Sequence, residues 1–403
     1  MPWRESSPVS ERKLFVRACT DRHRRIADIC SEFGISEKTG YKILSRYRQF
    51  GEAGLEDRSH AVLEHPFRIA EEVQEVILAL KRAHPDYGPR IIHDRLVQHE
   101  PLKHWPAASS IGELLKRHGL VHRRRPRNHD QERAHLNSSL TKASAPNLVW
   151  TADFKGEFRL RTGLGVYCYP LTVMDLNSRF VLGLKALGTT SVAQTMREFK
   201  RIFREYGLPR VIRTDNGVPF AHPNAIGRLG QLAIWWVKLG VKPEHIRPGR
   251  PSDNGAHERF HKTLKAAATK PAGTSFKSQQ QRFDDFIAEY NGHRPHRSLK
   301  DHRPPHEFYV NSPRRYPEKL PPVTYPDRAV MRLVNANGAI KWRSATIFLS
   351  SSIAGEYVGV LEEDQDFSVL FSNLQLGRID ADTNSFTPEV RWLQALTPAA
   401  VTD

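Results

Sequence analysis

The first sixty residues carry apolar positions three and four residues apart, the spacing of amphipathic helices. Over residues 8–60 this pattern predicts three short helices. The second of them has an apolar stripe formed by Ile26, Ile29, Cys30 and Phe33. Gly34 then supplies a turn, and Ser36 is a suitable N-cap for the third helix. A helix, a glycine turn and a second helix form the helix-turn-helix pattern.

The third helix separates apolar from basic side chains. Its spacing points Ile43, Leu44 and Tyr47 inward. The side chains expected to face DNA are Lys38, Thr39, Lys42 and Arg46. A basic outer face suits a recognition helix that enters the major groove. The alternative is an ordinary small helical bundle. We assign residues 1–62 to a helix-turn-helix DNA-binding domain.

A second helical unit is expected over residues 63–122. Residues 69–88 are amphipathic, the next helix starts with Pro89 in its first turn, and residues 109–120 have a serine cap and a glycine stop. The unit resembles a second helix-turn-helix. Residues 123–147 are polar and basic and predict a linker. Its Arg123, Arg124 and Arg125 are expected to contact phosphates, although a plain solvated tether is the alternative.

From residue 148 the pattern changes to short β-branched and aromatic runs separated by turn residues. Three strands in a meander, then a helix, a buried strand and further helices, predict a mixed α/β domain over residues 148–310. From residue 320 to 385 the pattern is again β-rich, with short alternating strands. Asn337-Gly338 is a strong hairpin signal there. We expect a small β-barrel in this region.

Charge narrows the class of partner. Lys and Arg outnumber Asp and Glu 61 to 44, a formal net charge of +17 in 403 residues. This surplus favours a polyanionic partner, most simply nucleic acid, although some proteins are basic without a specific reason. The three cysteines form no CxxC pair, which disfavours a zinc ribbon or a disulfide framework. No apolar run reaches the ~18–20 residues of a membrane span, so the expectation is a cytoplasmic protein with no membrane partner.

Three acids lie in or beside apolar segments that a buried sheet would bring together. Asp153 lies within the strand-like run VWTADF, Asp215 follows VIRT, and Glu258 lies one turn into a helix. An unpaired acid in an apolar strand is costly, so a metal or another cation is expected beside it. Two Mg²⁺ ions held by carboxylates can promote an in-line phosphoryl displacement. Spacing alone is weak evidence, because long chains contain many acid triplets.

Four motifs in order make a family resemblance specific: VWTADFKGEF, VIRTDNGVPF, PSDNGAHERFHKTLK and YNGHRPHRSL. They resemble the integrase core of bacterial insertion-sequence transposases, which belongs to the retroviral-integrase superfamily. The N-terminal residues 33–59 are similar to the helix-turn-helix of that group. The resemblance implies an RNase H-like fold and a DDE triad, which carries onto Asp153, Asp215 and Glu258. It also implies Mg²⁺ or Mn²⁺, two ions per site, as cofactors.

The resemblance implies a DNA transposase that binds the terminal inverted repeats of its element, cleaves at the 3′ ends and joins them to target DNA. Pairing of two ends would require a homodimer or a larger oligomer on DNA. Two alternatives remain open. One is a transposase-derived regulator that binds DNA without cutting it. The other is an RNase H-like nuclease that does not join strands.

The stretch His257–His261 also matches the H-E-x-x-H motif of zinc peptidases. That hypothesis needs a third ligand, for which Glu289 is a candidate, and it leaves Asp153 and Asp215 unexplained. In the integrase interpretation, His257 is a solvated residue of the first helical turn. The side chains expected to face DNA phosphates from this helix are His261, Lys262 and Lys265. Two other acids near the motifs are expected to be structural, Asp175 as a hairpin cap and Asp253 as a helix cap.

Overall fold

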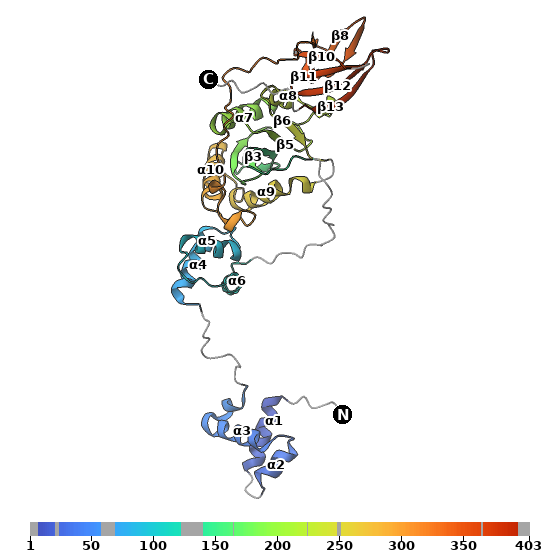
Figure 1. The fold of residues 1–403 in the computed structure, drawn as a ribbon. Helices are drawn as coiled ribbons and strands as arrows, with labels where there is room; N and C mark the ends of the chain where they lie inside the picture. Colours follow the sequence, from blue (N-terminus) through green and yellow to red (C-terminus); the bar gives the residue numbers. More distant parts are fainter. Residues whose placement is uncertain are drawn as a thin grey trace. The chain divides into compact units, whose positions relative to one another are not determined.

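The computed structural model describes residues 7–20, 24–57, 69–121, 140–163, 165–223, 225–247, 251–363 and 366–393. The chain divides into two compact units, residues 1–68 and residues 69–403 (Figure 1). Among the described residues no helix is long and apolar enough to cross a membrane.

The first unit is a three-helix domain. It contains α1 (Pro8–Thr20), α2 (Ile26–Glu32), α3 (Glu37–Phe50) and the 3₁₀ turn η1 (Gly51–Leu55). Its core is formed by Phe15, Val16, Ile29, Cys30, Leu44 and Leu55. Gly34 has a φ of 63°, and the Ser36 side chain accepts a hydrogen bond from Thr39 N. The expected turn and cap are thus confirmed. Tyr47, expected to point inward, is instead 37% exposed.

The second unit begins with three helices, α4 (Glu71–Ala83), α5 (Pro89–His99) and α6 (Ala108–Arg117). Their core includes Ile77, Ile92, Ile111 and Leu115, all fully buried. Pro89 lies in the first turn of α5, as expected. The expected serine cap of α6 is wrong, because Ala107 occupies the N-cap and makes no side-chain cap. Gly119 follows α6 with a φ of 67°, which fits the expected glycine stop.

The helices α4–α6 contact α10 (Phe276–Gly292) and the segment that follows it through buried polar groups. Arg294 Nη1 donates to Asp86 Oδ2 at 2.6 Å, and its guanidinium lies 4.9 Å from the centre of the Tyr87 ring. The Tyr87 hydroxyl donates to Glu289. Gln98 Nε2 donates to the backbone oxygen of His302 at 3.0 Å. Glu289 therefore belongs to this contact.

A mixed sheet lies at the centre of the second unit. Its strands are β1 (Val149–Phe154), β2 (Phe158–Arg159), β3 (Tyr167–Asp175), β4 (Val181–Leu187), β5 (Val211–Thr214) and β6 (Lys242–His245). Strands β1, β3 and β4 form the expected antiparallel meander, in which β3 pairs with both β1 and β4. On the other side β1 pairs parallel with β5, and β5 pairs parallel with β6. The short strand β2 extends the sheet beside the start of β3.

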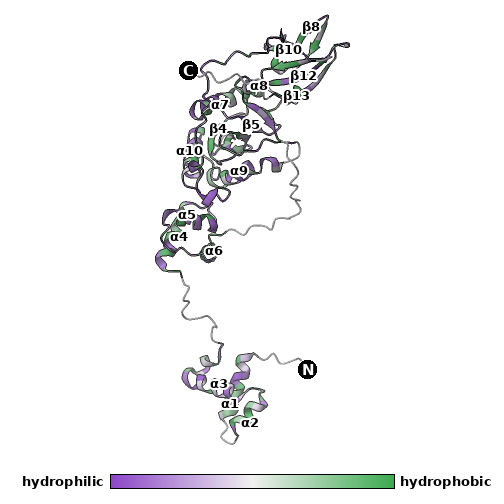
Figure 2. Cartoon of the chain, viewed as in Figure 1, coloured by the Kyte–Doolittle hydropathy of each residue, from purple (hydrophilic) through white to green (hydrophobic). Residues whose placement is uncertain are grey.

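Helices cover both faces of this sheet. Two more helices, α7 (Val192–Tyr206) and α8 (Gln231–Lys238), supply Phe199, Phe203 and Trp236 to the cluster that contains Trp150 and Ala152 of β1. On the other face, α9 (Gly255–Ala268) and α10 pack Phe260, Phe283 and Tyr290 against Met174 and Leu184. Helix α10 carries both apolar and polar residues (Figure 2). Because side chains alternate along a strand, Thr151 and Asp153 face the α9 layer.

The C-terminal region contains β7 (Val330–Leu333), β8 (Ala339–Trp342), β9 (Ala345–Phe348), β10 (Tyr357–Glu363), β11 (Asp366–Phe371), β12 (Leu374–Asp380) and β13 (Phe386–Trp392). The order β13-β12-β11-β10-β7 forms an antiparallel sheet, and β8 and β9 form a separate hairpin. Within the described residues β7 and β13 do not pair, so the sheet is open and the expected closed barrel is not observed. In this arrangement β8 and β9 pair with each other, and β7 is an edge strand of the five-stranded sheet.

The C-terminal sheet shares its hydrophobic core with the mixed sheet. One apolar cluster includes Trp236 of α8 together with Ile353, Val358 and Val369. Lys238 and Glu356 add an ion pair at 2.7 Å. The remaining short 3₁₀ turns are η2 (Ile226–Arg228), η3 (Pro251–Asn254), η4 (Lys300–His302), η5 (Pro305–Glu307) and η6 (Ser351–Ile353).

Candidate active site

Asp153 lies near the end of β1, on the face of the sheet that α9 covers. It is paired in register with Thr172 of β3. Its side chain is 22% exposed, so the carboxylate lies at the boundary between the core and solvent. The neighbours Trp150 and Ala152 anchor the other face of the strand in the core. The apolar residues of β1 thus fix the direction in which the Asp153 side chain points.

Asp215 follows β5 directly. Because β5 runs parallel to β1 with Thr214 beside Ala152, Asp215 emerges at the same edge of the sheet as Asp153. Its Oδ1 accepts a hydrogen bond from Gly217 N at 3.1 Å. A Cβ on Gly217 would lie 3.0 Å from Asp215 Oδ2. The glycine of the DNG motif therefore leaves room for this carboxylate.

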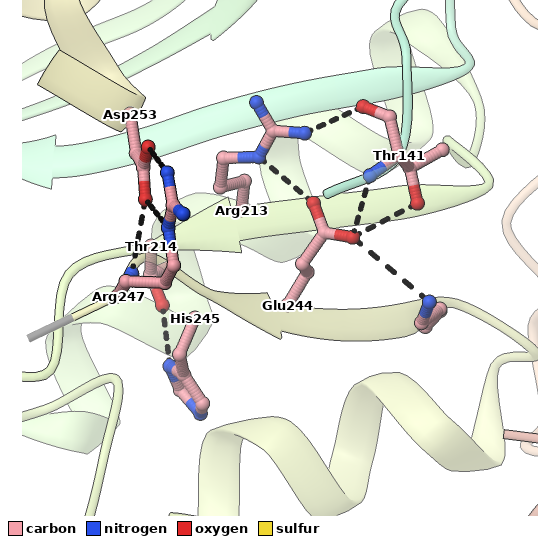
Figure 3. A network of polar contacts seen from close by, with 8 residues as sticks. Thr141, Arg213, Thr214, Glu244, His245, Arg247 and Asp253 are labelled. Atoms are coloured by element: carbon pink, nitrogen blue, oxygen red, sulfur yellow. Dashed lines mark hydrogen bonds and ion pairs between the residues drawn. The ribbon is translucent and has the colours of Figure 1, made fainter. Parts of the chain in front are cut away.

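A buried ion pair holds β5 against β6 (Figure 3). Arg213 Nε donates to Glu244 Oε2 at 2.8 Å, and Arg213 Nη2 donates to Thr141 O at 2.6 Å. Thr141 completes the ring by donating from its backbone nitrogen and its hydroxyl to Glu244 Oε1. Arg213 and Glu244 are both nearly fully buried. This network fixes the strand that leads into Asp215.

The same figure shows how the start of α9 is held. Arg247 Nη2 and Nε donate to the two carboxylate oxygens of Asp253 at 2.7 and 2.9 Å (Figure 3). The Arg247 guanidinium keeps the pKa of Asp253 below its usual range. Asp253 therefore joins β6 to the entry of α9, whose N-cap is Asn254, so its expected capping role is wrong. Glu258 follows in the first turn of α9 and is exposed.

The three acids interact electrostatically. Burial, together with the negative charges of Asp215 and Glu258, raises the pKa of Asp153 to about 7. Carboxylates raise one another's pKa in this way only when they are close together. Asp215 and Glu258 thus lie near enough to Asp153 for their charges to act on it, and the three acids are called the carboxylate cluster below. Such a cluster of acceptor-only groups favours a bound cation.

Beneath this cluster lies a hydrogen-bonded network of two histidines and two threonines. His257 Nδ1 lies 2.7 Å from Thr151 Oγ1, and His257 Nε2 lies 2.6 Å from Thr172 Oγ1. His261 Nε2 lies 2.8 Å from the same Thr172 oxygen. Burial lowers the pKa of His257 to about 3. Burial also lowers the pKa of His261, to about 2, and the nearby His257 and Lys155 contribute to that shift. Both imidazoles are therefore neutral at physiological pH.

This network corrects two sequence-based expectations. His257 is fully buried, so its expected position as a solvated residue is wrong. Both of its nitrogens are occupied by threonine hydroxyls, which leaves none for zinc. Asp153, His257 and His261 do have potential ligand atoms within 4.8 Å of one another. Glu289, the third ligand that the zinc-peptidase hypothesis required, bonds Tyr87 instead.

The residues expected to contact DNA have varied surroundings. Lys262 and Lys265 of α9 are exposed, whereas only 13% of the His261 side chain is exposed and it faces the network. In α3, Lys38, Thr39 and Lys42 are exposed. Arg46 instead donates to the backbone oxygen of Glu56 at 2.7 Å. The expected contacts at Arg123, Arg124 and Arg125 lie outside the described residues.

Sequence reasoning missed Thr151, Thr172 and Lys155. The pKa of Lys155 is lowered by burial and by the charge of Lys265, which places these two lysines close together. Thr151 and Thr172 are fully buried in the α9 face of the sheet. Their only signal in the sequence is a polar residue inside an otherwise apolar strand. Asp175 accepts from Ser178 N at 2.7 Å, which confirms its expected role in the hairpin.

Comparison with protein families matches the "Integrase core domain" to residues 143–251 and again to residues 239–305. A "Helix-turn-helix domain" matches residues 11–61, and a "Homeodomain-like domain" matches residues 39–115. These matches cover the region of the three acids and both N-terminal helical regions.

One similar protein is the "Insertion element IS476 uncharacterized 39.2 kDa protein" of Xanthomonas euvesicatoria. It is 26% identical over 270 residues, which cover 66% of this chain and 73% of that protein. The Pol polyprotein of feline endogenous virus ECE1 is 29% identical over 130 residues, 32% of this chain. The chain spans only 12% of that polyprotein.

Two solved structures are similar at lower identity. The magnesium complex of the HTLV-2 integrase catalytic core (trimeric form) has 14% identity and a TM-score of 0.33, with 42% of this chain and 100% of that chain covered. The simian T-cell lymphotropic virus intasome with PP2A regulatory subunit B56 gamma has 14% identity and a TM-score of 0.35, with 80% and 100% covered. From the sequence matches, the chain carries an integrase core domain behind N-terminal helix-turn-helix and homeodomain-like domains.

Proposed function

We propose that this protein is a DNA transposase that cleaves DNA at the 3′ ends of its element and joins those ends to target DNA. The observation that carries the proposal is that Asp153 and Asp215 follow paired residues of β1 and β5 at the same edge of a mixed sheet, with Glu258 of α9 near enough for its charge to act on Asp153. The sheet order agrees with the RNase H-like fold that the sequence motifs imply. The integrase-core match over residues 143–305 supports the same reaction class.

The three carboxylates would hold Mg²⁺ or Mn²⁺, two ions per site. The donor set fits this group, because ionised carboxylates offer only oxygen acceptors and here repel one another. Bound divalent ions would polarise the phosphate and stabilise the charge that develops on the attacking and leaving oxygens. The chain's own part is to hold the three carboxylates in register through β1, β5 and α9.

Basic residues beside the acids would bind the DNA backbone. Lys155 and Lys265 interact with each other and lie near Asp153, a suitable place for a phosphate that approaches the carboxylates. Lys262 and Lys265 extend this basic surface along α9. In the N-terminal domain, Lys38, Thr39 and Lys42 would contact the terminal repeats from the exposed face of α3.

The proposed division of labour follows the expected domains. Residues 1–62 and 63–122 would bind the element ends, 123–147 would link them to the core, and 148–310 would carry the reaction. The C-terminal region, expected over 320–385, would contribute DNA or subunit contacts. Its last strand runs to Trp392, beyond that boundary. Joining two ends requires that the protein act as a homodimer or larger oligomer.

The test uses oligonucleotides from the DNA that flanks the gene, with Mg²⁺ or Mn²⁺. We expect wild type to nick the 3′ end and Asp215→Asn to bind the same DNA without nicking it. The matched control is Glu157→Gln, which removes an exposed acid four residues from Asp153 and should keep its activity. Tight end binding without cleavage by wild type would instead identify a DNA-binding regulator. Cleavage without any joined product would identify a nuclease.

A further inference from the structure

The hydrogen-bond network under Asp153 fixes the positions of the protons on Thr172 and on the two imidazoles. The Thr172 hydroxyl lies 2.8 Å from the backbone oxygen of Asp153. A carbonyl oxygen carries no hydrogen, so this contact is a hydrogen bond only if the hydroxyl donates. A hydroxyl has one hydrogen. Thr172 Oγ1 must therefore accept from every other partner.

Its other partners are the two imidazoles. His257 Nε2 at 2.6 Å and His261 Nε2 at 2.8 Å must each carry a hydrogen and donate to Thr172 Oγ1. In neutral imidazole only one nitrogen carries a hydrogen, so both Nδ1 atoms have a free lone pair. The Thr151 hydroxyl lies 2.7 Å from His257 Nδ1 and 3.4 Å from Met174 O, and its one hydrogen is assigned to the shorter contact, so His257 Nδ1 accepts. This assignment of tautomers follows from the network.

The lone pair of His261 Nδ1 has a different neighbour. Asp153 Oδ2 lies 3.8 Å from it, beyond hydrogen-bond distance. When Asp153 is ionised both atoms are acceptors, so neither binds the other directly. Two ligand atoms about 2.1 Å from one metal ion lie about 3.0–4.2 Å apart for bond angles between 90° and 180°. The observed separation falls within that range, so one ion could bind both atoms.

The position of His261 on α9 supports the same arrangement. Glu258 and His261 are three residues apart, which places them on the same side of the helix. His261 Nε2 lies 2.8 Å from Thr172 Oγ1, and Thr172 is paired with Asp153 in the sheet, so that side of the helix lies against the sheet beside Asp153. The hydrogen bond from His261 Nε2 to Thr172 orients the ring so that His261 Nδ1 faces the carboxylates. Many metal-bound histidines are oriented in the same way by a hydrogen bond from the nitrogen that does not bind the metal.

We propose that His261 Nδ1 is a fourth protein ligand, beside the three carboxylates, to the divalent ion held by Asp153. This rests on the proposed metal-dependent function and adds a nitrogen donor to its site. Thr172 is then a positioning residue that fixes the tautomer of His261. His257, whose two nitrogens are both occupied, is structural. An imidazole ligand favours Mn²⁺ and Zn²⁺ relative to Mg²⁺, which prefers oxygen.

The experiment measures Mn²⁺ bound to the full-length protein by pulsed electron paramagnetic resonance, which detects the ¹⁴N coupling of a directly bound imidazole. We compare wild type with His261→Asn and His245→Asn. His245 is the matched control, because it is also a histidine close to one of the three acids: its Nδ1 lies 3.2 Å from Asp215 O. It lies on β6 and not on α9, so it is not expected to bind the ion held by Asp153. Asp153→Asn reports whether Mn²⁺ occupies the carboxylate site at all. Thermal melting and DNA-end binding verify that each variant is folded.

We expect ¹⁴N coupling in wild type and in His245→Asn and its loss in His261→Asn, with Mn²⁺ binding at least about tenfold weaker. The loss of affinity should be larger for Mn²⁺ than for Mg²⁺. If Mn²⁺ binds to wild type and is lost in Asp153→Asn but shows no ¹⁴N coupling, His261 is not a ligand and the proposed function still stands. If Asp153→Asn binds Mn²⁺ as wild type does, the metal site itself is wrong and both proposals fail.

Discussion

Replacing Asp153 with Asn should stabilise the metal-free protein at neutral and alkaline pH. In the folded chain the pKa of Asp153 is about 7, against a reference value of 3.8. Well below pH 3.8 the carboxyl is protonated in both states and carries no penalty, and at pH 4 the penalty is still under about 1 kcal/mol. As the pH rises towards 7 the unfolded chain loses this proton first, and folding stability falls. The change removes a carboxylate that is costly to ionise in the folded state.

The size of the effect follows from the shift in pKa. Each unit corresponds to about 1.4 kcal/mol, so a shift of about 3 units sets a ceiling of about 4 kcal/mol. Because 22% of the side chain is exposed and water screens part of the repulsion, we expect about 2–3 kcal/mol at pH 8. For a unit that spans residues 69–403, this corresponds to a rise in Tm of about 3–4 °C.

The assay is thermal unfolding in EDTA at pH 8 and at pH 4, with Glu157→Gln as the control. Asp153→Asn should melt above wild type at pH 8 and close to it at pH 4, whereas the control should match wild type at both. Added Mn²⁺ should raise the Tm of wild type more than that of Asp153→Asn. An equal difference in Tm at both pH values would refute the electrostatic reasoning.

Three further changes test other parts of the account. Thr172→Val leaves two buried imidazole N–H groups without an acceptor and should lower the free energy of unfolding by about 2–4 kcal/mol, whereas Thr172→Ser should restore most of it in the same melting assay. The double change Lys38→Ala and Lys42→Ala should weaken DNA binding and reduce its salt dependence by the equivalent of about two phosphate contacts. Lys13→Ala is the control and should change neither, because the Lys13 side chain pairs with Glu52. Arg294→Met leaves Asp86 buried and unpaired and should cost about 3 kcal/mol, seen as faster hydrogen exchange in α4–α6; unchanged exchange would contradict that contact.

The fold was largely predictable because periodicity reports burial. The glycine turn at Gly34, the cap at Ser36 and the meander of β1, β3 and β4 all follow from local pattern and turn chemistry. The expected barrel was not observed, because strand pairing depends on long-range partners that alternation does not specify. The predicted serine N-cap of α6 was also wrong. Ser109 and Ser110 are residue types that often cap helices, but α6 starts at Ala108, one residue before Ser109.

The candidate site was predictable at the level of residue identity but less so in its surroundings. The motifs led to Asp153, Asp215 and Glu258, which the fold brings into one cluster. They did not reveal that His257 is buried, because the helix presents that position to Thr151 and Thr172, which lie on two different strands. Such contacts depend on the sheet register, which places Asp153 opposite Thr172. A helical pattern alone gives the face of a side chain and not its partner.

The central claim is that the three carboxylates support DNA strand joining. The measurement is the covalent joining of a labelled element end, with its 3′-OH already exposed, to a target plasmid in Mn²⁺, for wild type and Glu258→Gln at equal DNA occupancy. We expect joined product from wild type and none from Glu258→Gln, with the end bound equally well by both. Joining by Glu258→Gln at the wild-type rate would contradict the account.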